Sequence, residues 1–308
     1  MSLVERFKSK GPSGFGYGST AEQVTARLSL SGKTVLVTGC NSGLGQESLR
    51  VLTLRGARVV GTARTLEKAE ATCAAVGGDT VPLACELSDP ASVRACVESV
   101  KRAGIELDAI LCNAGIMALP KLQQAHGFEL QFFTNHIGHF MLVTGLLDQL
   151  KDRGRVVMLS SAAHQMAPRE GIQFDNLSGE KGYSPFRAYG QSKLANLLFA
   201  KELARRFAGT SKTANAVHPG VIQTNLARSM NPATTYLFNL IGPLFGKDVP
   251  QGAATQLYAA VHPATENVSG AYFADCNVAR NRADADDAAL AKRLWEVSAE
   301  IVAGLPSS

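Results

Sequence analysis

The sequence predicts a doubly wound α/β fold, in which helices cover both faces of one parallel sheet. Short runs rich in β-branched residues alternate with longer segments that have a helical pattern, which is typical of β-α-β units. The chain has 308 residues, of which 45% are hydrophobic and 19% charged, as expected for a globular domain with a sizeable core. The predicted strands are Thr34–Thr38, Arg58–Ala63, Thr80–Cys85, Ala109–Cys112, Arg155–Ser160, Thr213–Val217 and Gly270–Phe273. The predicted helices between them include Gly45–Leu54, Asp89–Lys101, Phe128–Leu150 and Pro185–Phe207.

Two parts of the chain depart from this alternation. Residues 1–30 combine a Gly/Ser-rich stretch, Gly11–Ser19, with a short helical pattern over Ala21–Leu28. We expect them to form a tail that packs on the outside of a single domain spanning 31–308. Residues 221–250 mix large apolar side chains with prolines. Because long loops inside a compact domain are usually functional, this stretch predicts a substrate lid, or alternatively a helix pair buried against the core.

Charge and cysteine usage exclude several classes of protein. The formal net charge is only +5 and the basic residues are scattered, so nucleic-acid binding is not expected. The six cysteines form no C-x-x-C pairs, which predicts buried reduced thiols in the cytoplasm and neither a disulfide framework nor a metal site. No apolar stretch reaches the roughly 18 residues of a membrane helix, and the first residues lack the apolar core of a secretory signal. The sequence therefore predicts a soluble protein.

The first predicted strand runs into a glycine-rich turn that opens a helix. In this context the backbone amides and the positive end of the helix receive a pyrophosphate, and the glycines allow its close approach. This is the Rossmann arrangement for a dinucleotide, although a tight turn without a ligand is the alternative. The residues expected to bind the cofactor here are Gly39, Asn41, Ser42, Gly43, Leu44 and Gly45.

The second predicted strand ends without the acidic residue that usually binds the adenosine ribose hydroxyls. Arg64 stands there instead, and a guanidinium is suited to a 2′-phosphate. The absence of a carboxylate that would repel this phosphate favours NADP(H) over NAD(H). The alternative is that Arg64 is only a surface charge at a strand end.

Three further strands end in polar or glycine-containing segments. In chain order, the segments at these strand ends are Asn113-Ala114-Gly115, Ser160-Ser161 and His218-Pro219-Gly220. Open parallel sheets bind ligands at the carboxyl ends of their strands, so we expect these segments to meet at one site.

A tyrosine and a lysine stand four residues apart in Tyr189-Gly190-Gln191-Ser192-Lys193. On a helix this spacing places both side chains on one face. We expect the ammonium to lower the pKa of the phenol, so that Tyr189 can give or take the proton of an alcohol. Together with the glycine-rich turn, the pair predicts hydride exchange between a nucleotide cofactor and a carbonyl or alcohol.

These motifs together resemble the short-chain dehydrogenase/reductase family, from about residue 30 to the C-terminus. The retinol dehydrogenase branch has similar strings, here Asn135-His136-Ile137-Gly138-His139-Phe140, Phe174–Lys181, Lys193-Leu194-Ala195-Asn196 and Leu294-Trp295-Glu296-Val297-Ser298. The N-terminal segments Lys10-Gly11-Pro12-Ser13-Gly14-Phe15 and Ser19-Thr20-Ala21 are similar to dehydrogenases associated with the chloroplast inner-envelope translocon.

The resemblance implies a role for each matching residue. Tyr189 would be the catalytic acid/base, Lys193 its pKa tuner and a ligand of the nicotinamide ribose, and Ser161 a hydrogen-bond partner of the substrate oxygen. Asn135 would hold a water that links Lys193 to the solvent. Glu86-Leu87 stands where the family usually has an aspartate that reads the adenine, which weakens that assignment. The remaining implied cofactor contacts are Asn113, Ala114, Gly115, Pro219, Gly220, Val221 and Thr224.

The sequence thus predicts an NADP(H)-dependent oxidoreductase acting on a bulky lipophilic carbonyl or alcohol, such as a retinoid, steroid, long-chain aldehyde or polyketide ketone. A light-dependent protochlorophyllide reductase is disfavoured because its insertion is longer than 221–250. The competing hypothesis is a catalytically weak protein of the same fold that senses NADPH or acts as a scaffold. A homo-oligomer is left open.

Four polar residues outside these motifs invite a functional interpretation. His136 and His139 lack a metal-binding partner at suitable spacing, so we expect helix packing or hydrogen bonding. His164 and Asn176 lie in an extended loop that could touch the substrate, but we expect them at the surface.

Overall fold

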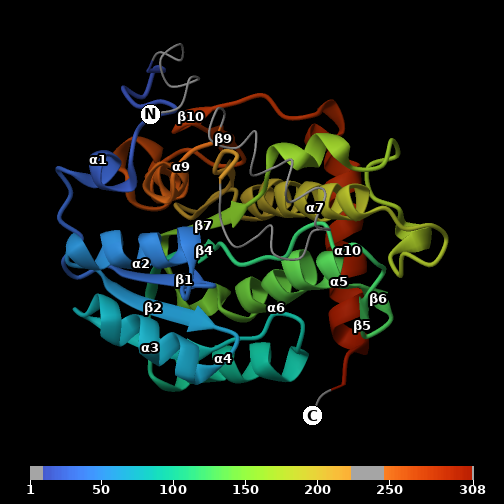
Figure 1. Ribbon diagram of the computed structural model, residues 1–308, viewed down its shortest axis with the longest axis horizontal. Helices are drawn as coiled ribbons and strands as arrows, with labels where there is room; N and C mark the ends of the chain where they lie inside the picture. Colours follow the sequence, from blue (N-terminus) through green and yellow to red (C-terminus); the bar gives the residue numbers. More distant parts are fainter. Residues whose placement is uncertain (1–9, 223–245, 307–308) are drawn as a thin grey trace.

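The computed structural model describes residues 10–222 and 246–306 and confirms the predicted single-domain α/β fold. Among these residues, one eight-stranded sheet has the order β10-β9-β8-β7-β4-β1-β2-β3 (Figure 1). Its strands are parallel except for the antiparallel pair of β9 and β10. The strands are β1 (Thr34–Thr38), β2 (Arg58–Ala63), β3 (Thr80–Ala84), β4 (Leu107–Cys112), β7 (Leu150–Leu159), β8 (Thr213–His218), β9 (Tyr272–Ala274) and β10 (Asn277–Val278). A small separate hairpin pairs β5 (Gln124–Ala125) with β6 (Phe128–Glu129).

Helices cover both faces of the sheet, so the central strands are buried on both sides. In β1, Val35 and Val37 belong to one hydrophobic cluster and Leu36 to the other, because successive side chains of a strand point to opposite faces. The α-helices are α1 (Ala21–Thr25), α2 (Gly43–Leu54), α3 (Leu66–Val76), α4 (Pro90–Arg102), α5 (Leu130–Phe132), α6 (Gly138–Gly145), α7 (Pro185–Arg206), α9 (Val249–Val261) and α10 (Ala288–Gly304). The cluster with Leu36 contains residues of α4, α6, α7 and α10, and the other contains residues of α1, α2, α3 and α9.

The segment predicted as one helix, Phe128–Leu150, is divided into several elements. It begins in β6 and α5, continues as a π-helix over Phe133–Ile137 and then as α6, and a 3₁₀ turn over Leu147–Gln149 leads into β7. The packing is close where α6 begins: a Cβ on Gly138 would stand 2.3 Å from the carbonyl oxygen of Leu87. The helix therefore approaches the loop after β3 at backbone distance, and the π-helical turn precedes this contact.

Several strand boundaries also differ from the prediction, that of β7 by the most. β7 begins at Leu150, five residues earlier than predicted, because Leu150 pairs with Leu107 of β4; beside this pair, Lys151 forms an ion pair with Asp108 (Nζ to Oδ2, 2.8 Å). β10 was not predicted at all, since its two residues, Asn277 and Val278, are too few to show a strand pattern.

Residues 10–30 lie against the domain through aromatic and helical contacts. The ring of Phe15 packs edge-on against Tyr258 and His262, with centroids 5.8 and 5.7 Å apart. Helix α1, which begins with a capping box between Thr20 and Gln23, lies beside α9 although the two are far apart in sequence (Figure 1).

Most of the stretch predicted as a lid, together with Thr224, lies outside the described residues. Its two ends are described: the amide of Lys247 donates to the carbonyl oxygen of Val221 at 2.8 Å, and Ile222 and Lys247 form an isolated parallel bridge. The last predicted lid residues already belong to α9. Among the described residues, no helix combines the length and the apolar character needed to cross a membrane.

The close contact at Gly138 yields a stability prediction. Alanine normally stabilises a helix interior by up to about 1 kcal/mol relative to glycine. We expect Gly138→Ala to lower the free energy of unfolding by about 1–3 kcal/mol instead, because the new methyl group meets a backbone atom that cannot move aside cheaply. Urea denaturation measures the change. The matched control is Gly304→Ala, whose Cβ meets nothing within 4 Å; equal effects of both substitutions would contradict the packing argument.

Candidate active site

The sheet order brings the predicted strand ends together. The neighbouring strands β8, β7, β4 and β1 end at His218, Leu159, Cys112 and Thr38, all at the carboxyl edge. The segments that follow them contain Gly220, Ser161, Asn113 and Gly39. These residues come from separate parts of the chain and lie side by side because parallel strands end at the same edge.

Thr38 connects the glycine-rich turn to the end of β4. Its hydroxyl oxygen accepts the amides of Asn113 (2.9 Å) and Ala114 (3.0 Å), and the Asn113 side chain donates to the Thr38 carbonyl oxygen (2.9 Å). The turn itself is tight: Gly39 has φ +67°, and a Cβ on Gly45 would stand 2.1 Å from the Gly39 carbonyl oxygen. Larger residues at these two positions would open the turn that faces the first amides of α2.

Within the turn, Ser42 is the residue before the first residue of α2, and its side chain makes no capping hydrogen bond. Gly43 has φ +53°, a left-handed conformation that glycine adopts without strain. The first amides of a helix lack partners within the helix, and they carry the positive end of its dipole. This arrangement fits an anionic pyrophosphate.

His139 extends the contact of Thr38 to the π-helix. Its two ring nitrogens lie 2.9 Å from the Thr38 hydroxyl (Nε2) and 2.9 Å from the Asn135 carbonyl oxygen (Nδ1). Burial lowers the pKa of His139 to about 4, so the ring is neutral near pH 7. Since a carbonyl oxygen only accepts, Nδ1 carries the hydrogen, and Nε2 accepts the hydroxyl hydrogen of Thr38.

Asn135 is fixed on all sides. Its Oδ1 accepts the amide of Ile116 (2.8 Å), and its Nδ2 donates to the Ile116 carbonyl oxygen (2.9 Å) and to the hydroxyl of Ser192 (2.9 Å). Gly115 fits between Asn135 and Lys193, because a Cβ there would lie 2.9 Å from Asn135 Oδ1 and 3.5 Å from Lys193 Nζ. Two of the predicted catalytic residues, Asn135 and Lys193, thus lie against the segment that follows β4.

Lys193 and Tyr189 lie on the buried face of α7, beside the end of β7. The ammonium of Lys193 donates to the Leu159 carbonyl oxygen at 2.9 Å and stands 5.7 Å from the centre of the Tyr189 ring. The hydroxyl of Ser160 donates to the carbonyl oxygen of Lys193 at 2.8 Å, which ties the helix to the strand end. Ser161 caps a 3₁₀ turn over Ala162–Met166 by accepting the Ala163 amide (3.1 Å), and its hydroxyl also hydrogen-bonds to Tyr189.

The expectation that Lys193 lowers the pKa of Tyr189 is wrong in this structure. Burial raises the pKa of Tyr189 to about 12, and the hydrogen bond from Ser161 offsets this only partly. Burial also lowers the pKa of Lys193 to about 8. Both groups are removed from water, which penalises the charged form of each, and Nζ is directed at a carbonyl oxygen. Tyr189 is therefore a neutral proton donor at ordinary pH.

His164 and Asn176 were expected at the surface, and the structure corrects both. His164 is buried beneath Ser161: its Nδ1 donates to the Ser161 carbonyl oxygen (2.6 Å), and its Nε2 accepts the amide of Arg282 (3.3 Å). Its ring also meets Tyr272 edge-on, with centroids 5.0 Å apart. Asn176 is buried within its own loop and accepts the amide of Lys181 (2.9 Å).

His136 and His139 are hydrogen-bonded, as predicted. The Nε2 atom of His136 lies 2.8 Å from the Ser298 hydroxyl. In the part of the chain that the structure describes, no group of three or more His, Cys, Asp or Glu side chains could hold a metal ion. All six cysteines are buried, free thiols.

The predicted adenosine contacts lie at the ends of β2 and β3. Arg64 is exposed and directly follows β2. Glu86 turns its carboxylate back to its own loop, where Oε1 accepts the amide (3.2 Å) and the hydroxyl (2.9 Å) of Ser88. Leu87 is buried. Glu86, which stands where the family usually has an aspartate, thus stabilises its own loop through hydrogen bonds from Ser88.

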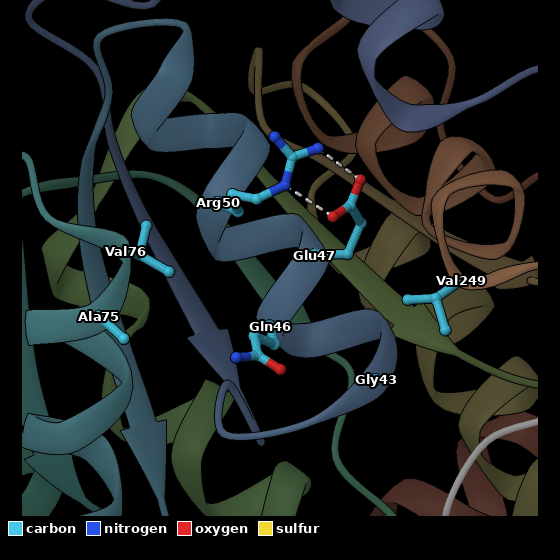
Figure 2. A pocket seen from close by; sticks show the side chains of 7 residues that line it. All are labelled: Gly43, Gln46, Glu47, Arg50, Ala75, Val76 and Val249. Atoms are coloured by element: carbon cyan, nitrogen blue, oxygen red, sulfur yellow. Dashed lines mark hydrogen bonds and ion pairs between the residues drawn. The ribbon is translucent and has the colours of Figure 1, made fainter.

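A hollow lies along α2, where α2 faces the end of α3 and the start of α9 (Figure 2). It is lined by Gly43, Gln46, Glu47, Arg50, Ala75, Val76 and Val249. Arg50 donates to both carboxylate oxygens of Glu47, as the dashed lines in Figure 2 show, and also to Glu22. The charged groups of this hollow therefore satisfy one another, and it shares only Gly43 with the predicted site.

Comparison with known proteins identifies the family. A family model described as short chain dehydrogenase matches residues 33–235. The chain belongs to the short-chain dehydrogenase/reductase family. It is 40% identical over 96% of its length to the chloroplastic short-chain dehydrogenase TIC 32 A of Brassica napus, covering 97% of that protein. It is also 40% identical to human retinol dehydrogenase 11, covering 92% of this chain and 89% of the relative. The family resemblance predicted from the sequence is thereby confirmed.

Solved structures give the same result. A crystal structure of an uncharacterised protein from Mycobacterium paratuberculosis is 35% identical, with a TM-score of 0.75 over 93% of this chain and 98% of that one. A blue fluorescent protein from a metagenomic library, solved in complex with NADPH, is 25% identical with a TM-score of 0.64, covering 80% and 96% of the two chains. Members of this family are oxidoreductases that bind a nicotinamide cofactor and a substrate.

The residues present fit such a cofactor. A Cβ on Gly39 or Gly45 would clash within the turn, so the chain at these two positions presents backbone without side chains, which is what close approach of a phosphate requires. Lys193 can donate three hydrogen bonds, and the described contact to Leu159 uses one, so the ammonium can also bind ribose hydroxyls.

The buried lysine yields a prediction about stability and pH. The pKa of Lys193 is about 8 in the folded protein, whereas an ordinary lysine has a pKa of about 10.5. Between these two pH values, the unfolded state binds more protons at this site than the folded state does. The contribution of Lys193 to the free energy of unfolding should therefore rise with pH across this window, by up to about 1.4 kcal/mol per pH unit.

Denaturation of the wild type and of Lys193→Met at several pH values measures this contribution as the difference between the two proteins. The difference should change in favour of the wild type from pH 8 to pH 10. A difference independent of pH in that range would show that Lys193 has an ordinary pKa in the folded protein.

Proposed function

We propose that the protein is an NADP(H)-dependent oxidoreductase that transfers hydride between the nicotinamide and a carbonyl or alcohol of a bulky lipophilic substrate. The observation that carries the proposal is the meeting of Tyr189, Lys193 and Ser161 beside the glycine-rich turn, at one edge of the sheet. We also propose that Gly39, Asn41, Ser42, Gly43, Leu44 and Gly45 cradle the pyrophosphate, with Asn113, Ala114, Gly115, Pro219, Gly220, Val221 and Thr224 along the rest of the cofactor.

The bound cofactor would supply or accept the hydride, and the chain's own residues would handle the proton. In the reduction of a carbonyl, the neutral phenol of Tyr189 donates its proton to the substrate oxygen as negative charge develops there. Ser161 hydrogen-bonds the same oxygen. Lys193 holds the ribose and stabilises the phenolate that forms, and Asn135 positions a water that returns the proton from solvent.

Two exposed apolar side chains support a lipophilic substrate. Met166 is 49% exposed at the end of the turn that Ser161 begins, and Val221 is 46% exposed just after Gly220. Both flank the predicted site, where they would contact an apolar ligand. Several relatives at about 40% identity, such as human retinol dehydrogenase 11, are named for a lipophilic alcohol.

Arg64 supports NADP(H) as the cofactor. Its guanidinium is exposed at the end of β2, where the adenosine ribose of a dinucleotide bound to the glycine-rich turn would lie.

We also propose a cytoplasmic location, on the basis of the buried free cysteines. A relative at 40% identity is chloroplastic, so cell fractionation is the measurement that distinguishes the two locations.

The direct test of the proposed reaction is a panel of lipophilic aldehydes and ketones with NADPH. On a substrate that the wild type reduces, Tyr189→Phe should lower turnover by roughly 10²- to 10⁴-fold, the range for a lost acid/base group, while cofactor binding persists. Tyr183→Phe is the control, because Tyr183 donates to the Leu119 carbonyl oxygen outside the reacting set. Wild-type turnover by Tyr189→Phe would remove Tyr189 from the mechanism, and binding of NADPH without any turnover would favour a sensor or scaffold.

Cofactor selectivity tests the role of Arg64. We expect Arg64→Ala to weaken NADPH binding by about 1.5–3 kcal/mol and to leave NADH affinity nearly unchanged, since only NADPH has the phosphate that the guanidinium would bind. Arg58→Ala is a matched control at the other end of the same strand, where Arg58 pairs with Asp79. Dissociation constants from calorimetry decide the matter: equal binding of NADPH and NADH by the wild type would contradict the NADP(H) assignment.

A further inference from the structure

A buried lysine joins three segments behind the predicted cofactor site. The side chain of Lys247 is only 1% exposed, and its ammonium lies 2.7 Å from a carboxylate oxygen of Asp275 in the turn between β9 and β10. The same ammonium stands over the ring of Tyr17, 4.8 Å from its centre. A charged group this deeply buried requires such partners, because an unpaired charge in the interior is strongly disfavoured.

The turn that carries Asp275 also holds the N-terminal segment, residues 10–19. Asn277 Oδ1 accepts the amide of Ser13 (3.0 Å), and its Nδ2 donates to the Phe15 carbonyl oxygen (3.1 Å). Gly11 packs so tightly on Asn277 that a Cβ would lie 2.5 Å from its side chain. Residues 10–19 are therefore attached to the turn of Asp275 at several points.

On its other side, Lys247 supports the corner that follows β8. Gly220 has φ +101° and packs on the lysine stem, since a Cβ there would lie 2.7 Å from Lys247 Cδ. The backbone amide of Lys247 donates to Val221 at 2.8 Å. The next residue, Ile222, lies against α9: a Cβ on Gly252 would stand 2.2 Å from Ile222 and 2.7 Å from Leu44 of the glycine-rich turn.

We propose that Lys247 is a positioning residue that couples residues 10–19 to the cofactor site. The chain of contacts runs from Ser13 and Tyr17, through Asp275 and Lys247, to the backbone at Gly220. This inference rests on the proposed function in one respect, that the corner at Gly220 faces the bound dinucleotide. Because coupling between two sites is reciprocal, cofactor binding should order residues 10–19, and disturbing that segment should weaken the cofactor. The N-terminal segment would then report whether the site is filled.

Amide hydrogen exchange followed by mass spectrometry tests the contact chain without cofactor. Lys247→Met keeps the stem that packs on Gly220 and removes the charge. We expect it to accelerate exchange about tenfold or more in peptides covering both 10–19 and 217–222. Lys151→Met is the matched control, because Lys151 pairs with Asp108 at the opposite edge of the sheet. Unchanged exchange in 10–19 would overturn the proposal.

The reciprocal experiment separates coupling from a merely structural role. Saturating NADPH should slow exchange in residues 10–19 of the wild type, and this protection should be lost in Tyr17→Leu, which removes the aromatic face over the ammonium together with the phenol hydroxyl. Tyr17→Leu should also weaken NADPH roughly tenfold, whereas Lys151→Met should not. Protection of 10–19 that survives in Tyr17→Leu would contradict the coupling.

The two proposals fail in different ways. A wild-type protein that binds neither NADPH nor NADH would refute the proposed function, while exchange in the absence of cofactor would still decide whether Lys247 links the two segments. If Lys247→Met does not fold, the double variant Lys247→Met/Asp275→Asn removes both charges and leaves none buried without its partner. Its exchange in 10–19 then gives the answer: rates equal to those of the wild type would show that the ion pair does not couple the segments.

Discussion

The hydroxyl of Thr38 is the point on which the geometry of the candidate site depends. It accepts two amides from the segment after β4 and donates to His139, whose other nitrogen donates to the Asn135 carbonyl oxygen. Because the Asn135 carbonyl oxygen can only accept, the direction of each hydrogen bond in this chain is determined. A hydroxyl in the last residue of β1 thereby fixes the glycine-rich turn relative to the π-helix.

Burial, more than proximity of charge, sets the acidity of the reacting groups. Tyr189 and Lys193 share a helix face, yet the removal of the phenol from water outweighs the hydrogen bond from Ser161, so the pKa of Tyr189 rises to about 12. The same burial lowers the pKa of Lys193 to about 8. A neutral Tyr189 beside Lys193 suits the reduction of a carbonyl. When Tyr189 gives up its proton, the phenolate that forms stabilises the charged form of Lys193.

The sequence predicts the fold and the candidate site correctly wherever the informative residues are close together in the chain or repeat with a regular period. Strand ends, the turn at Gly39 and the pair at Tyr189 and Lys193 are local patterns, and the parallel sheet then brings them to one edge. The π-helix was missed because the packing beside it, such as the contact of Gly138 with Leu87, is visible only in three dimensions.

The positions of His164 and Lys247 were missed for a related reason. His164 is held by Arg282, 118 residues away, and Lys247 by Tyr17 and Asp275. No local sequence pattern predicts partners that are so distant in the chain, and a histidine or lysine in a loop is ordinarily exposed. The predicted direction of the pKa shift at Tyr189 was wrong for the same reason. Spacing along a helix shows which groups are neighbours but not how much water surrounds them.

The central claim is that a nicotinamide dinucleotide binds across the carboxyl edge of the sheet, between the glycine-rich turn and Lys193. A crystal structure of the protein with NADPH tests it most directly. We expect the pyrophosphate over the first amides of α2, the 2′-phosphate at Arg64 and the nicotinamide ribose at Lys193. A dinucleotide bound instead in the hollow along α2, between Arg50 and Val249, would contradict this claim.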